Sequence, residues 1–260
     1  MGDVAARVVC EVYGVRPLPD ASLGYRPQHV DLQRHSPLTA PLAVRIWDLP
    51  TRVFHAALAL LVTAAIVTAE LGGNWMAWHL RCGEAVMALL LFRWAWGGVG
   101  GRWSRLRAFL PGPARLVRAL RGRATAADGI GHGALGSLSV WAFLLLLSLQ
   151  VATGLAADDD MATTGPLNAH VGGHLAKRAS GWHAGWGANL ILALIALHVL
   201  AIGWYTLRRR APLLRAMWTG DKPLPPDTPA SQDDLGRRLL ALALAAAASA
   251  AVWALVRWAD

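Results

Sequence analysis

Residues 181–205 read GWHAGWGANLILALIALHVLAIGWY, an uncharged apolar run with a histidine near each end. A helix needs about 20 apolar residues to cross the roughly 30 Å of hydrocarbon in a bilayer, and this run is long enough. An imidazole is costly in hydrocarbon, so an ionisable residue at such a place is a functional-site hypothesis by default. His183 and His198 therefore predict both a membrane fold and a site inside it.

Four further apolar runs extend this pattern along the chain, at residues 53–71, 77–98, 133–157 and 239–256. The chain is 55% hydrophobic and only 16% charged, a balance that disfavours an ordinary soluble domain. We therefore predict an all-α integral membrane protein. Its first four helices form a bundle, and the run at 239–256 adds a fifth, C-terminal transmembrane helix.

The basic residues predict the orientation of these helices. Arginines and lysines gather between the second and third runs and between the fourth and fifth, whereas the loop after the first run has none. The positive-inside rule then places the N-terminus and both basic loops in the cytoplasm of a bacterium and the C-terminus outside its inner membrane. Arginines that flank membrane spans suit contact with anionic lipid, and a nucleic-acid partner is not expected.

This orientation sorts four histidines by depth. His55 and His79 lie near the starts of the first and second runs, and His183 and His198 lie at the two ends of the fourth. Because the first helix runs outward and the second and fourth run inward, His79 shares the outer layer with His183. His55 shares the inner layer with His198. Fifteen residues at 1.5 Å each put about 22 Å between the layers.

Two imidazoles that approach from opposite sides are the axial ligands of a six-coordinate haem, and helix bundles build such sites in their cores. Two layers therefore predict two haems. No CxxCH segment exists for covalent attachment, so both would be haem b, suited to electron transfer rather than substrate activation at iron. Structural zinc, which takes four close ligands, and interhelical hydrogen bonding are the competing interpretations.

Local residues add candidate cofactor contacts. Gly83 and Gly187 each follow an outer-layer histidine by four positions, which leaves space for a flat macrocycle on that face or allows close helix packing. Arg93 could meet a haem propionate or extend to the interface. Glu84 lies deeper and could be neutral, paired or part of a proton path.

The other histidines carry weaker predictions. We interpret His29, His35 and His132 as solvated or locally hydrogen-bonded. His170 and His174 are spaced for one helical face, but no third metal ligand is obvious, which favours a surface or partner-contact role.

Several short motifs support the haem hypothesis from another direction. They are Val44-Arg45-Ile46-Trp47-Asp48-Leu49-Pro50-Thr51-Arg52-Val53-Phe54-His55, His79 with Gly83, Phe92-Arg93 with Trp96-Gly97 and Gly100, Gly131-His132, Thr153-Gly154-Leu155, Gly165-Pro166-Leu167, Leu197-His198, and Leu214-Arg215-Ala216-Met217 with Thr219-Gly220. In these residues the chain resembles the bacterial cytochrome b561 family, in the branch that includes hydrogenase b-type cytochrome subunits. The likeness covers residues 44–225.

The resemblance implies the same four histidines as ligands of two haems, and electron transfer between an external redox partner and membrane quinone. We further expect Arg52 and Arg93 to contact a cofactor. A c-type cytochrome or a hydrogenase-like complex would suit as the periplasmic partner, steered by Asp158, Asp159 and Asp160. A self-contained oxidation of superoxide or another small donor, a haem-free scaffold or transporter subunit, and a homo-oligomer stay open.

Two departures from the family bear on the site. The two ligands of the fourth helix are usually fourteen positions apart in the family and fifteen positions apart in this chain, which predicts a π-bulge or a shifted ligand. Position 84 is often aromatic in the family, where this chain has Glu84. We divide the chain into a poorly ordered cytoplasmic tail at 1–43, a di-haem domain at 44–225, and a linker with the fifth helix at 226–260.

Overall fold

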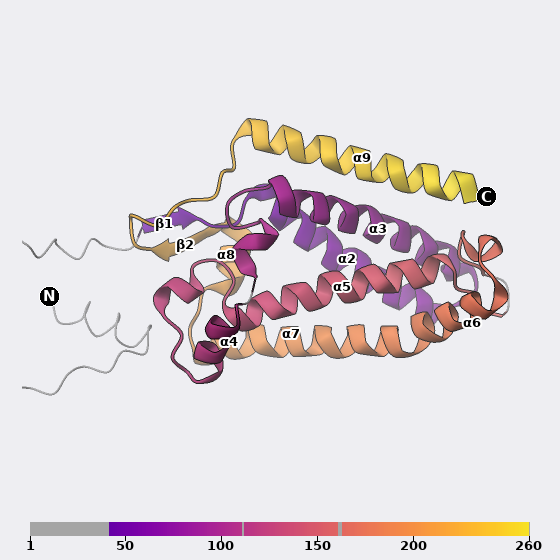
Figure 1. Cartoon of the computed structure of the whole chain (residues 1–260), viewed down its shortest axis with the longest axis horizontal. Helices are drawn as coiled ribbons and strands as arrows, with labels where there is room; N and C mark the ends of the chain where they lie inside the picture. The colour runs from indigo at the N-terminus through magenta and orange to yellow at the C-terminus, as the bar shows by residue number, and fades with distance from the viewer. Residues whose placement is uncertain (1–41, 111, 161–162, 260) are drawn as a thin grey trace, which may run out of the picture.

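The computed structural model describes residues 42–110, 112–160 and 163–259. The expectation of a poorly ordered tail falls almost wholly outside these residues. Its last two positions, Leu42 and Ala43, belong to the strand β1 (Leu42–Arg45). In Figure 1 the long helices lie alongside one another, and the strands lie at one end of them.

The first two long helices form an antiparallel pair. α2 (Leu49–Leu71) begins at the N-cap Asp48, whose side chain accepts from the backbone N–H of Thr51, and Pro50 supplies the fixed φ that suits a first turn. α2 ends at Gly72, at a φ of 61° that favours glycine. The short η2 (Gly73–Trp75) then leads directly into α3 (Met76–Val99).

The next two long helices are each preceded by short helices. α5 (Ala134–Leu155) follows η3 (Leu106–Phe109), α4 (Pro113–Leu120) and η4 (Ala126–Gly129). After η5 (Asn168–His170), one continuous helical segment comprises α6 (Gly173–Gly181), the π-helix η6 (Trp182–Gly187) and α7 (Ala188–Arg208). The segment therefore starts eight residues before the apolar run at 181–205.

The fifth long helix, α9 (Leu235–Ala259), packs along α3, as Figure 1 shows. The buried core draws on all five long helices: Phe54 from α2, Leu90 from α3, Leu144 from α5, Ile191 from α7 and Ala248 from α9. Much of the remaining apolar surface faces outward, as lipid-facing side chains do.

Among the described residues, four segments are long and apolar enough to cross a membrane: Leu49–Leu71, Ala127–Ala156, Gly173–Arg208 and Leu235–Ala259. α3 has 24 residues but is not among them, and it carries Arg81, Glu84 and Arg93. The part of the chain that the structure describes is thus mostly helical with four apolar spans, and a fifth crossing by α3 stays a prediction.

A small two-stranded sheet modifies the all-α expectation. β1 pairs antiparallel with β2 (Asp221–Leu224), which follows α8 (Leu213–Thr219), and Leu42 faces Leu224 in this register. Between α8 and β2, Gly220 has a φ of 90°, and a Cβ there would lie 2.6 Å from the carbonyl oxygen of Trp47. The turn therefore requires glycine. The sheet fixes the chain just before α2 against the chain just after α8.

Candidate cofactor site

The structure brings the four sequence-predicted histidines together as two pairs. His79 on α3 faces His183 on η6, with ring centroids 5.8 Å apart and ring planes at 79°. His55 on α2 faces His198 on α7, with centroids 6.5 Å apart and planes at 50°. Each pair draws its members from two different helices, and the two pairs lie at opposite ends of α7 and η6.

The spacing of both pairs suits one metal ion between two imidazoles. An imidazole nitrogen binds a metal at about 2 Å, so two rings on opposite sides of one iron have centroids roughly 6 Å apart. Rings in direct contact could also stack at this distance. The hydrogen bonds of the ring nitrogens show whether each ring has a nitrogen free to bind a metal.

In the outer pair, both rings use the same nitrogen for a backbone contact. Nδ1 of His79 lies 2.8 Å from the carbonyl oxygen of Ala65, and Nδ1 of His183 lies 2.9 Å from that of Gln150. A carbonyl only accepts, so each Nδ1 donates and the tautomer leaves Nε2 with a free lone pair. Metal-ligating histidines are oriented by this kind of contact.

The π-helix around His183 confirms the prediction drawn from the extra residue in the ligand spacing. A π-turn shifts the backbone pairing by one residue. Here the amide of Gln150 donates from Nε2 to the carbonyl oxygen of His183 at 2.8 Å. Gln150 on α5 therefore contacts His183 at two points, through its side chain and through its own carbonyl.

A glycine on α5 gives the His183 ring its space. A Cβ at Gly154 would lie 2.6 Å from Cε1 of His183, closer than real Cβ contacts. The sequence shows Gly154 as one of the family-like marks, but only the structure shows what it touches. The sequence did not predict a role for Gly154 or Gln150 in the site.

The inner pair is held differently. Among the described residues, neither ring of the pair makes a hydrogen bond. Phe143 on α5 presents its ring at 83° to that of His198, with centroids 5.4 Å apart. Packing against an aromatic ring thus orients His198, where carbonyl contacts orient the outer pair.

The two glycines that were predicted to make room for a macrocycle differ. A Cβ at Gly83 would meet nothing within 4 Å, so space is open beside His79. A Cβ at Gly187 would meet the side-chain oxygen of Gln150, and it would lie 2.7 Å from Nε1 of Trp182. The absent side chain at Gly187 therefore admits Gln150 and Trp182, rather than leaving a cradle.

Two arginines near the inner pair carry unpaired donors. Arg93 is only 3% exposed, its guanidinium lies 6.0 Å from the Phe54 ring and 5.5 Å from the Phe109 ring, and its Nη1 has no hydrogen-bond partner. Nε of Arg52 is buried and unpartnered as well. Buried donors without partners are rare, and an anionic group such as a carboxylate would satisfy them.

Asp48 is a buried hub that the sequence reasoning did not single out. Its carboxylate is fully buried and accepts from the Thr51 amide at 2.9 Å, the Trp96 indole at 3.3 Å, the Gly101 amide at 3.2 Å and the Ser104 hydroxyl at 2.6 Å. It therefore joins the first turn of α2 to the end of α3. The sequence signal was present as an N-cap aspartate before a proline at the first turn.

His132 corrects the expectation of a solvated histidine. Its ring packs 4.5 Å from the Trp47 ring and 4.9 Å from the Phe109 ring, and Nδ1 is buried without a partner. His170 packs edge-on against Trp258 at the end of α9, with centroids 4.8 Å apart. Within the described residues, no three metal-binding side chains come together, which leaves a four-ligand zinc site without support there.

With this geometry in view, a comparison with known families gives one match, described as prokaryotic cytochrome b561, over residues 46–220 of the chain. The chain belongs to the prokaryotic cytochrome b561 family. No curated protein and no solved structure matches it. As a member of this family, the cytochrome is a multi-pass membrane protein of electron transfer that binds haem b.

The residues present fit the group that the family implies. The histidine pairs have the right spacing, the outer rings leave Nε2 free, a slot lies open at Gly83, and the inner end offers unpaired arginine donors. The family match ends at residue 220, so α9 lies outside it.

Proposed function

We propose that this cytochrome holds two b-type haems, one at each histidine pair, and passes electrons across the membrane between a periplasmic redox protein and the quinone pool. The observation that carries the proposal is the joint geometry of the pairs. Both have the centroid spacing of axial ligands, and in the outer pair the Nδ1 atoms donate to backbone carbonyls. When bound, each haem would supply a one-electron carrier.

The chain's own residues account for the rest of this function. Two histidines at one iron leave no open coordination position, which favours electron transfer over chemistry at the metal. Arg93 and Arg52 would bind propionates at the inner end, and their buried unpaired donors support this role. The apolar helix surfaces keep water from the pairs.

The orientation rests on the basic loops, with the N-terminus cytoplasmic and the C-terminus periplasmic. The outer pair then lies near the acidic loop, where a periplasmic partner would dock. Asp158 and Asp159 accept backbone N–H groups of their own loop, from Asp160 and Thr163, while Asp160 is exposed. Asp160 is therefore the carboxylate best placed to meet a basic partner.

Haem content measured on purified variants tests the two-haem proposal. The wild type should show a b-type reduced-minus-oxidised spectrum and two haems per chain by pyridine haemochrome. His55→Ala and His79→Ala should each lose one haem. His174→Ala changes an exposed histidine outside both pairs, and it should keep both haems.

Other results of these experiments would contradict the proposal. Unchanged haem content in both ligand variants would refute the assignment, and a chain purified without any b-type spectrum would favour the scaffold alternative. Direct reduction by a small donor, with no protein partner present, would favour the self-contained oxidoreductase.

A further inference from the structure

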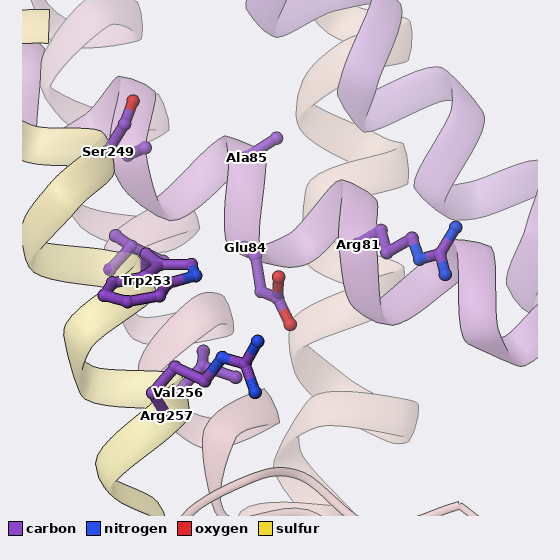
Figure 2. A pocket seen from close by; sticks show the side chains of 9 residues that line it. Arg81, Glu84, Ala85, Ser249, Trp253, Val256 and Arg257 are labelled. Atoms are coloured by element: carbon purple, nitrogen blue, oxygen red, sulfur yellow. The ribbon is translucent and has the colours of Figure 1, made fainter. Parts of the chain in front are cut away.

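A groove with charged side chains among a mostly apolar lining lies between α3 and α9, away from the histidine pairs. Its volume is about 270 Å³, small for a cofactor as large as haem, and its lining includes Arg81, Glu84, Trp253 and Arg257. Glu84 follows His79 by five positions on α3, which places the two about 140° apart around the helix. Figure 2 shows Glu84 and Arg257 projecting from the two helices into the same space.

Glu84 is the residue of this groove whose burial is energetically unfavourable. It lies within the helix α3, is half-buried, and makes no hydrogen bond or ion pair among the described residues. A carboxylate in an apolar surrounding needs a cation or a hydrogen-bond donor. The side chain therefore indicates a ligand that brings one.

The two arginines of the groove are positioned but not paired. The guanidinium of Arg81 lies 5.0 Å from the Trp78 ring centre, and that of Arg257 lies 5.7 Å from the Trp253 ring centre. Cation–π contact holds a guanidinium in place without using its N–H donors. Neither arginine makes a hydrogen bond or ion pair within the described part of the chain, so these donors are available to an anion.

Exposed tryptophans place the groove at the level of lipid head groups. Trp78 is 53% exposed near the start of α3, and Trp253 and Trp258 are 65% and 68% exposed near the end of α9. Indole rings gather at the membrane–water interface. The groove thus brings one anionic side chain, Glu84, and one cationic side chain, Arg257, together at head-group depth. Ser249 also lines it, and Ala85, Ala88, Val252 and Val256 form its apolar wall.

We propose that this groove binds the head group of an aminophospholipid, phosphatidylethanolamine. The primary ammonium donates to the Glu84 carboxylate, the phosphate accepts from Arg257, and an acyl chain lies along the apolar wall. Arg81 points away from these two side chains in Figure 2 and is not needed for the contact. The lipid thereby joins α9, which lies outside the family match, to α3. The proposal does not depend on the haem assignment.

The charged residues of the groove distinguish among phospholipid head groups. Phosphatidylglycerol offers a phosphate and neutral hydroxyl donors but no cation for Glu84, so its contact with the carboxylate is weaker than a charge-assisted one. Phosphatidylcholine carries a quaternary ammonium, which has no N–H to donate. Of these three head groups, the primary ammonium alone brings both a positive charge and N–H donors to the glutamate, and it leaves the phosphate for Arg257.

Lipid retention tests the proposal on the full-length protein. The protein is reconstituted in nanodiscs with equal parts of phosphatidylethanolamine, phosphatidylglycerol and phosphatidylcholine, and native mass spectrometry then measures the lipids that stay bound. The wild type should retain phosphatidylethanolamine in preference to the other two. Glu84→Gln should lower this preference about tenfold, the effect of losing one charge-assisted hydrogen bond.

Two further variants separate the parts of the site. Arg257→Gln should lower the retention of all three lipids, because it removes a phosphate contact. Glu70→Gln makes the same charge change at the exposed end of α2, outside the groove, and it should retain lipids as the wild type does. The haem spectrum and the melting temperature verify that each variant is folded.

Identical lipid selection by the wild type and Glu84→Gln would overturn the proposal. The proposal would also be overturned if the protein retained all three lipids equally and a double-mutant cycle showed strong coupling between Glu84→Gln and Arg257→Gln in the free energy of unfolding. That combination means a direct ion pair between α3 and α9.

Discussion

Gln150 and His183 hold each other at two points. The side-chain amide of Gln150 donates to the carbonyl oxygen of His183 at 2.8 Å, and Nδ1 of His183 donates to the carbonyl oxygen of Gln150 at 2.9 Å. The first bond satisfies a carbonyl in the π-turn, and the second fixes the ring. Backbone irregularity and ligand orientation are therefore coupled through one residue on a neighbouring helix.

Gln150→Met should disturb the outer haem and leave the inner one unchanged. Methionine keeps the volume and removes the donor, so the carbonyl of His183 loses its partner and the ring loses part of its support. We expect the electron paramagnetic resonance signal of one low-spin haem to shift in g value, with the second signal unmoved. A shift of both signals, or of neither, would mean that Gln150 does not position His183.

Gly154→Ala should remove the outer haem. The added Cβ would lie 2.6 Å from Cε1 of His183, which forces the ring out of line. Pyridine haemochrome should give one haem per chain in place of two. Gly136→Ala is the matched control on α5, because a Cβ there would meet only a distant atom, 4.0 Å away in His132, and both haems should remain.

The histidine pairs could be predicted because the membrane restricts the geometry. Each helix crosses one slab at a fixed rise per residue, so sequence position and orientation together give depth. The extra residue in the spacing of His183 and His198 came instead from the comparison with the family's usual spacing, and the π-helix absorbs it. The spacing of the two histidines thus predicted where the helix departs from regular α-helical geometry.

The contacts around the pairs could not be predicted in this way. Gln150 meets His183 across 33 positions of sequence, and β1 pairs with β2 across more than 170. Nδ1 of His132 is buried because the rings of Trp47 and Phe109, from other parts of the chain, pack against the imidazole. These contacts depend on how helices and loops pack, which hydrophobic patterning does not encode residue by residue.

Arg93→Gln should lower the midpoint potential of the inner haem. A buried guanidinium near the cofactor favours its more negative, reduced state, and glutamine removes that charge while keeping a donor. We expect a fall of tens of millivolts in one of the two potentials by spectroelectrochemical titration. Arg102→Gln changes an exposed arginine beyond the end of α3, and it should leave both potentials unchanged.

Lys222 gives the protein a dependence on alkaline pH. Its ammonium donates to the carbonyl oxygens of Gly129, Ile130 and Gly131, and burial lowers its pKa from 10.5 to about 8. Between these two pKa values the unfolded chain binds more protons than the folded one, so this group's contribution to the free energy of unfolding rises with pH.

The melting temperatures of wild type and Lys222→Met measure this contribution. The difference, wild type minus variant, should grow between pH 7.5 and pH 9.5. The same comparison with Lys177→Met, an exposed lysine, should give a difference that does not change with pH. A constant difference for Lys222→Met would show that its proton is not linked to folding.

Asp48→Ala should destabilise the inner end of the protein more than an ordinary helix cap would. Loss of an N-cap costs about 1 kcal/mol, and here the indole of Trp96 and the hydroxyl of Ser104 also lose a buried acceptor, for a total of about 2–4 kcal/mol. Since α2 carries His55 seven positions further on, we expect the inner haem to be released first on heating. Thermal melts followed at the haem absorbance should show one early transition in Asp48→Ala, and simultaneous loss of both haems would contradict the local role.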